Sequence, residues 1–338
     1  MRTKARIRRR ALCLALLAAA LGGIGAKEAS PFSRALAAYR DRKLDEAYRY
    51  AKEAVLQEPG HVDAHALLGE LYYLKQDLQR AQECWERALR LAPSRQDIRE
   101  RLEKLKGEIQ VERNLARSDT HPFVVRFADG QVPVDLGALR QLLRDVHRQV
   151  GQQFEYFPDH SITVILYPEA DFQKVKGLSH QVAGLYDGKI RLPMRHGRMS
   201  EKELARILWH EYAHALVHDL AKGACPLWLN EGIATAQEGR VAPVDLAAFR
   251  HAQRQGKVPS WDDLWSAQQY REETLPLYYQ TSYLLVSYLV KRWSWRDLVQ
   301  LLGRLGQGYP IADALRTVYR TDPATLEQEW RDWLRRRL

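Results

Sequence analysis

Two short motifs limit what this chain can fold into. They are HEYAH at residues 210–214 and WLNEG at residues 228–232. On an α-helix, residues four apart are turned about 40° from each other and lie about 6 Å apart along the axis, so His210 and His214 can bind one ion. Glu211 lies beside the first histidine, where a carboxylate can take a proton from an activated water molecule. The first motif therefore predicts a zinc site with its own general base.

The residues around the first motif predict a long, half-buried helix. Ser200 and Glu203 form a capping box, and residues 201–220 contain no proline or glycine. Apolar side chains form a stripe along this segment: Leu204, Ile207, Leu208, Ala215 and Leu216. A second helix is expected from about Pro226, and the short connection brings Glu231 alongside the two histidines. Two imidazoles and one carboxylate leave one zinc position open for water, as in a catalytic site.

A third histidine on the same helix raises an alternative set of ligands. His218 follows His214 by four residues, so three imidazoles lie along one slowly drifting face. A metzincin site would need a glycine at position 217 and a histidine at position 220, but the chain has Val217 and Leu220. We therefore expect His218 near the helix end, where its positive charge is favourable, and not on the metal.

The two motifs together resemble those of gluzincin metallopeptidases, most closely the bacterial peptidase MA-like group. Members of that group often follow a secretion signal and tetratricopeptide repeats. The resemblance covers residues 120–338 and implies an α+β, thermolysin-like domain, with a small sheet above the active-site helix and a helical C-terminal part. It makes His210, His214 and Glu231 the zinc ligands and Glu211 the general base.

The chain departs from the gluzincin pattern in two places. It has no Gly-x-Met-Glu-Asn segment, with which aminopeptidases of that clan hold the free amine of the substrate, so an endopeptidase is expected. Thr235 stands one helical turn after Glu231, where thermolysin-like enzymes have an aspartate that supports a metal ligand.

The resemblance also implies a hydrogen-bond donor for the tetrahedral oxyanion, supplied by a downstream tyrosine or histidine. Residues 277–293 predict a helix that closes the cleft and carries several tyrosines. Tyr279 is the first candidate for this catalytic role and Tyr283 the second.

An internal repeat precedes the motifs. A shift of 34 residues superimposes Leu44 on Leu78, Ala47 on Ala81, Ala54 on Ala88 and Pro59 on Pro93. This is the period of the tetratricopeptide repeat, so residues 28–113 predict two helix pairs and a charged capping helix from about residue 95. Two interpretations stay open: the array is a docking surface for a protein partner, or it is a spacer packed on the catalytic domain.

A mixed region connects the repeats to the motifs. Residues 115–120 are expected to be a linker, and the part of the chain beyond residue 234 is expected to be mostly helical. The patterns in between predict a strand at 123–127, a helix at 135–152, a strand at 162–166 and a hairpin around 187–188. By the resemblance, residues 184–192 are the candidate edge strand that pairs with an extended substrate.

The positive charge of the chain is concentrated at its N-terminus. The formal net charge is +10, and six basic residues within the first ten positions account for the excess over about +4. Because no basic stripe with interleaved aromatic residues occurs elsewhere, nucleic acid is not an expected partner. The basic residues lead into an uncharged apolar run, so residues 1–26 predict a signal peptide. The alternative is an uncleaved N-terminal membrane anchor, although the run is shorter than the roughly 20 residues of a spanning helix.

These patterns predict an exported zinc-dependent endopeptidase of the periplasm or the extracellular space, held at the inner membrane if the N-terminal segment is not cleaved. Its expected partners are a peptide or protein substrate and a protein bound by the repeats. Two alternatives remain. One is a repeat-containing scaffold or assembly factor of the cell envelope with little or no hydrolytic activity, and the other is a zinc hydrolase of a non-peptide amide.

Overall fold

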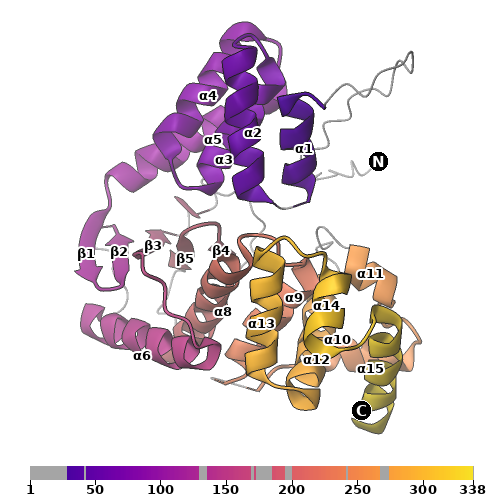
Figure 1. The fold of residues 1–338 in the computed structure, drawn as a ribbon. Helices are drawn as coiled ribbons and strands as arrows, with labels where there is room; N and C mark the ends of the chain where they lie inside the picture. Colours follow the sequence, from indigo (N-terminus) through magenta and orange to yellow (C-terminus); the bar gives the residue numbers. More distant parts are fainter. Residues whose placement is uncertain are drawn as a thin grey trace, which may run out of the picture.

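The protein is described by a computed structural model. The described residues are 29–41, 43–128, 135–168, 171–172, 185–194, 200–240, 243–266 and 274–337. The predicted signal segment, residues 1–26, lies outside them. Figure 1 shows an N-terminal helical array above a small sheet, and a group of C-terminal helices beside it.

The N-terminal array consists of two helix pairs and a fifth helix: α1 (Pro31–Arg40), α2 (Leu44–Gln57), α3 (Val62–Leu74), α4 (Leu78–Leu91) and α5 (Gln96–Arg113). Small residues let the helices of a pair approach closely. A Cβ atom added at Gly69 of α3 would lie 2.5 Å from the Trp85 ring of α4, so that position needs a residue without a side chain. The indole of Trp85 donates a hydrogen bond of 3.1 Å to the carbonyl of Ala66. The helix pairs predicted from the 34-residue period are present.

The sheet has five strands: β1 (Ala116–Thr120), β2 (Phe123–Phe127), β3 (Ile162–Pro168), β4 (Leu185–Tyr186) and β5 (Ile190–Met194). Their order is β1-β2-β3-β5-β4; β2, β3 and β5 run parallel, and the two outer strands are antiparallel to their neighbours. The prediction of a linker at residues 115–120 is wrong, because residues 116–120 pair with β2. Most residues of this strand are polar, so its sequence lacks the alternation of apolar and polar residues that predicts a strand. It lies at an edge of the sheet.

Two sets of helices cover the two faces of the sheet. Alternate residues of β5, such as Ile190 and Leu192, point into the main hydrophobic core, to which α6 (Leu136–Phe154) and α8 (Glu201–Ala221) contribute. On the opposite face, Ile165 and Tyr167 of β3 pack with Val111 near the end of α5. The last helix of the repeat array therefore also covers one face of the sheet.

The rest of the chain is helical: α9 (Leu227–Glu238), α10 (Ala247–Arg254), α11 (Trp261–Ser266), α12 (Leu275–Arg292), α13 (Trp295–Gly306), α14 (Ile311–Tyr319) and α15 (Pro323–Arg337). Gly232 of α9 lets α12 come very close, since a Cβ atom there would lie 2.4 Å from the backbone oxygen of Ser282. The predicted α+β fold and helical C-terminal part are confirmed. Among the described helices, none is long and apolar enough to cross a membrane.

Candidate metal centre

Helix α8 holds the first motif in a buried, regular stretch of backbone. Its start is capped as the sequence predicts, since the Ser200 hydroxyl accepts a hydrogen bond of 3.2 Å from the backbone N–H of Glu203. His210 and His214 follow in the middle of the helix and are each 9% exposed. Their ring centroids lie 4.6 Å apart, so both imidazoles face one small volume.

Helix α9 brings the third predicted ligand to the same volume. It begins directly after Pro226 and carries Glu231 on the face that packs against α8. One carboxylate oxygen, Oε2 of Glu231, lies 3.6 Å from Nε2 of His210 and 3.6 Å from Nε2 of His214. One atom of each of the three side chains lies within 4.8 Å of the others. The structure thus brings together the three residues predicted to bind zinc.

The residues present fit a bound zinc ion. Oε2 of Glu231 and Oε2 of Glu211 are buried and have no hydrogen-bond partner among the described residues. Buried carboxylate oxygens without partners are unfavourable, and a cation would satisfy them. Two imidazole nitrogens and one carboxylate oxygen form the donor set of catalytic zinc sites, which keep a fourth position free.

Two side chains that the sequence did not predict orient the histidines. Nδ1 of His214 donates a hydrogen bond of 2.9 Å to Oδ1 of Asn230, which leaves the lone pair of that ring at Nε2 for the metal. Nδ1 of His210 forms a close ion pair, 2.5 Å long, with Oε1 of Glu238. Such contacts fix the ring orientation and raise the basicity of the ligand.

In the gluzincin pattern, the residue one helical turn after Glu231 supports a metal ligand. In this chain Glu238 contacts the ligand His210 instead. The residue one turn after Glu231 is Thr235, whose hydroxyl has no hydrogen-bond partner within the part of the chain that the structure describes. Glu238 lies seven residues after Glu231, so two helical turns return it to the same face. This spacing was the signal that could have identified it.

The electrostatics of the site follow from burial and from its three carboxylates. Burial raises the pKa of Glu211 to about 8, with Glu231 and Glu238 adding to the effect and His210 opposing it. Burial also acts to raise the pKa of Glu231, but His214 and His210 outweigh it and lower that pKa. For His210, the carboxylates of Glu231 and Glu238 overcome the effect of burial and hold its pKa well above the usual value. A divalent cation would stabilise the charged carboxylates and lower the pKa of Glu211.

Of the two candidate tyrosines, Tyr279 lies at the centre. Its ring centroid is 6.2 Å from that of His210, and its side chain forms a hydrogen bond with Glu231 that helps to lower the pKa of that carboxyl. A cavity of about 180 Å³ is lined by Tyr279 and Glu238 among others. Tyr283, by contrast, packs against the hydrophobic core. The catalytic role of Tyr279 stays a prediction.

The candidate substrate strand lies at an edge of the sheet. Of residues 184–192, the structure describes 185–192, which form β4, the turn and the start of β5. Strand β4 is last in the sheet order and contacts α8, the helix of the first motif. Its pairing with a substrate stays a prediction.

Comparisons with known proteins give matches to two family models. Residues 202–336 match the model of the Peptidase MA superfamily, and residues 62–95 match that of the tetratricopeptide repeat. The chain carries a Peptidase MA domain. The resemblance to gluzincin peptidases with tetratricopeptide repeats is thereby confirmed, and the matched residues of the Peptidase MA domain include both motifs.

One solved structure and the curated proteins complete the comparison. The crystal structure of an M1 zinc metallopeptidase from Deinococcus radiodurans is similar at a TM-score of 0.41 and 21% identity. The similarity covers 65% of this chain and 51% of that chain, so this chain spans about half the length of that enzyme. Comparison with curated proteins gives no match.

Replacing Glu238 by glutamine is expected to weaken zinc binding by the Peptidase MA domain about 10- to 100-fold, because the charged partner of His210 is lost. Competition with a chromophoric zinc chelator measures the affinity. Thr235→Val is the matched control on the same helix, and it should leave the affinity unchanged. Equal losses in both variants would contradict the assigned role of Glu238.

Proposed function

We propose that this protein is an exported zinc-dependent peptidase that cleaves internal peptide bonds. The observation that carries the proposal is the meeting of His210, His214 and Glu231 around one buried volume, with Glu211 beside them. A metal-binding scaffold would need the three ligands alone. The adjacent buried carboxylate of Glu211 is what hydrolysis of an amide bond requires.

The chain's own residues supply the proton transfers. A bound Zn²⁺ acts as a Lewis acid that polarises the scissile carbonyl and lowers the pKa of water. Glu211 accepts a proton from the attacking water and delivers it to the leaving amine as the C–N bond breaks. Tyr279 donates a hydrogen bond to the oxyanion that develops on the carbonyl oxygen, and such a donor contributes about 3 kcal/mol of transition-state stabilisation.

The proposed substrate is an extended peptide that adds a strand to the sheet. Strand β4 lies at the sheet edge beside α8, and among the described residues the end of β5 has no partner strand on that side. Backbone hydrogen bonds there would align a peptide irrespective of its sequence. The sequence has no Gly-x-Met-Glu-Asn segment, with which aminopeptidases of the gluzincin clan hold the free amine of the substrate, and this supports internal cleavage.

We further propose that the protein works outside the cytoplasm, in the periplasm or the extracellular space. The support is the basic and then apolar composition of residues 1–26, which acts as a cleaved signal or as an N-terminal anchor in the inner membrane. The tetratricopeptide repeats support a protein partner, since such arrays commonly present extended binding surfaces.

The proposed function is tested by incubating the zinc-loaded protein with a diverse peptide mixture and identifying the products by mass spectrometry. Internal cleavage that stops with a chelator and returns with zinc is the expected result. Cleavage only of N-terminal residues would overturn the endopeptidase assignment. Stoichiometric zinc without any turnover, together with a co-purifying partner, would favour a repeat-containing assembly factor instead.

A further inference from the structure

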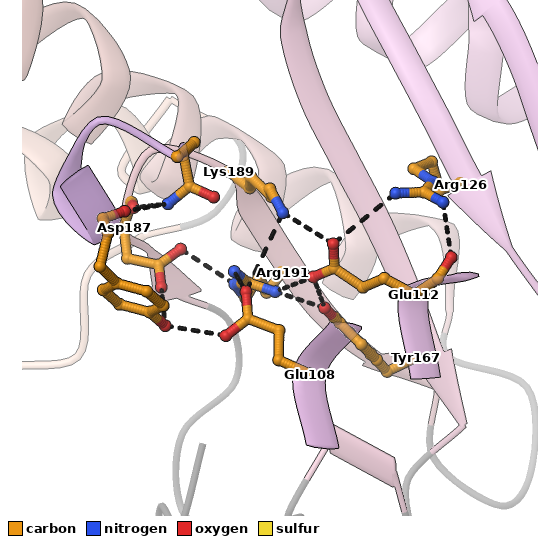
Figure 2. Close-up of polar contacts among 9 residues, drawn as sticks. Glu108, Glu112, Arg126, Tyr167, Asp187, Lys189 and Arg191 are labelled. Atoms are coloured by element: carbon orange, nitrogen blue, oxygen red, sulfur yellow. Dashed lines mark hydrogen bonds and ion pairs between the residues drawn. The ribbon is translucent and has the colours of Figure 1, made fainter. Parts of the chain in front are cut away.

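A buried ion cluster joins the repeat array to the edge of the sheet (Figure 2). Arg191 of β5 is fully buried and pairs with Glu108 and Glu112, which both project from α5. Its Nε also donates a hydrogen bond of 2.9 Å to Oδ1 of Asp187 in the β4–β5 turn. All three guanidinium nitrogens of Arg191 are therefore bound by carboxylates, two of which belong to the repeat array.

Further contacts complete the cluster. Nζ of Lys189 donates to Oε2 of Glu112 over 2.7 Å, and Nη1 of Arg126 lies 3.6 Å from the same oxygen. The hydroxyl of Tyr73, at the end of α3, donates to Oε2 of Glu108 over 2.9 Å. The cluster is balanced, with three carboxylates against three cations: Glu108, Glu112 and Asp187, and Arg126, Lys189 and Arg191.

The turn of the hairpin fits against the end of α3. The side-chain amide of Gln76 donates a hydrogen bond of 2.5 Å to the backbone oxygen of Asp187. Gly188 has φ +98°, and a Cβ atom there would lie 2.7 Å from the Gln76 side chain. The repeat array thus contacts both the backbone of the turn and the charged side chains beside it.

The cluster fixes the position of the β4–β5 hairpin relative to α5. Buried charges are removed from water at a cost, so such a cluster is favourable only when every member keeps its partners in place. Strand β5 is consequently held on two faces. Ile190 and Leu192 are anchored in the core below the sheet, while Arg191 between them is held by α5 above it.

The outer strand of the hairpin, β4, has little support of its own, whereas β5 pairs with β3 along its whole length. Within the described residues, strand β4 has two residues and pairs with β5 through Leu185–Arg191 and Tyr186–Ile190. The ring of Tyr186 packs against that of His218 on α8, with centroids 5.9 Å apart, so the hairpin also touches the metal-binding helix. The position of the edge relative to the metal centre therefore depends on what holds the hairpin.

We propose that the tetratricopeptide repeat array is a positioning element of the peptidase, which clamps the β4–β5 hairpin where an extended substrate pairs with the sheet. Glu108 and Glu112 are positioning residues that act through Arg191 and Lys189 without touching the substrate. This inference rests on the proposed function, because it gives the hairpin a substrate to align. According to this inference, the face formed by α3 and α5 binds the chain's own β4–β5 hairpin.

The test uses the full-length chain with Glu108→Gln, which removes one charge of the cluster and keeps the shape of the side chain. Hydrogen–deuterium exchange of residues 185–194 is expected to become at least about tenfold faster. KM for extended peptides should rise about tenfold with kcat nearly unchanged, since uniform binding of the substrate backbone is lost. Bound zinc should stay stoichiometric.

The matched control is Glu70→Gln, which breaks the ion pair with Arg101 inside the repeat array and leaves the hairpin untouched. It should change neither the hairpin exchange nor KM. If Glu108→Gln does not fold, Tyr73→Phe removes one hydrogen bond of the cluster and should accelerate exchange of the same residues to a smaller extent.

The outcomes separate this inference from the proposed function. Unchanged hairpin exchange in Glu108→Gln, or equal acceleration in Glu70→Gln, overturns the clamp even if the protein cleaves peptides. Faster hairpin exchange with unchanged KM overturns the positioning role. Faster hairpin exchange in a protein whose wild type cleaves no peptide supports the clamp and overturns the proposed function.

Discussion

Replacing Glu211 by glutamine is expected to lower kcat/KM for peptide hydrolysis by about 10²- to 10⁴-fold while zinc stays bound. Glutamine keeps the shape of the side chain but cannot accept the proton of the attacking water. The carboxylate oxygen Oε2 of Glu211 is buried and without a hydrogen-bond partner in the described ranges, so the substitution breaks no structural contact at that atom. Peptide turnover and metal content, measured on the same preparation, check both parts of the prediction.

The matched control for this variant is Glu201→Gln, an exposed glutamate in the first turn of the same helix. Its turnover should match that of the wild type. A Glu211→Gln protein that retains zinc and cleaves peptides within a factor of ten of the wild type would remove Glu211 from the role of general base.

Replacing Glu231 by alanine is expected to abolish tight zinc binding and, with it, all turnover, since only the two imidazoles remain as ligands. Zinc at a thousand times its Kd stabilises a protein by about 4 kcal/mol, which corresponds to a Tm increase on the order of 10 °C for a domain of this size. The wild type should show that increase when zinc is added to chelator-treated protein. Glu231→Ala should show almost none.

Calorimetric scans with and without zinc measure this difference. Glu329→Ala serves as the control, because Glu329 accepts a hydrogen bond from Tyr288 on α12, away from the centre. It should keep the full zinc-dependent shift. A Glu231→Ala protein with the same shift as the wild type would show that the ion binds elsewhere.

Local patterns in the sequence predicted the helices and most of the strands. The capping box, the apolar stripe of residues 201–220 and the 34-residue period each depend on neighbours in the chain, and the helices that they predicted are present. The grouping of His210, His214 and Glu231 came from motif spacing, which fixes residues on adjacent helices that are joined by a short loop.

Features that depend on distant parts of the chain were missed. Glu108 and Glu112 lie in the charged segment that predicts a helix capping the repeat array, and nothing in that prediction indicated that they are buried, at 1% and 3% exposed. Their partner Arg191 is 83 and 79 residues away, and periodicity shows which residues share a face without showing what covers it. For the same reason, the polar residues 116–120 gave no signal of the strand that they form at the sheet edge.

Helix α5 limits how the two parts of this protein can be recombined. Its first half completes the repeat array, and its second half supplies Glu108, Val111 and Glu112 to the face of the sheet. An exchange of repeats between related proteins would leave Arg191 with Asp187 as its counter-ion and without both glutamates, unless α5 stayed with the sheet. The end of α3 and the second half of α5 therefore have to co-vary with the β4–β5 hairpin, whereas the helices that do not contact the hairpin can diverge more freely.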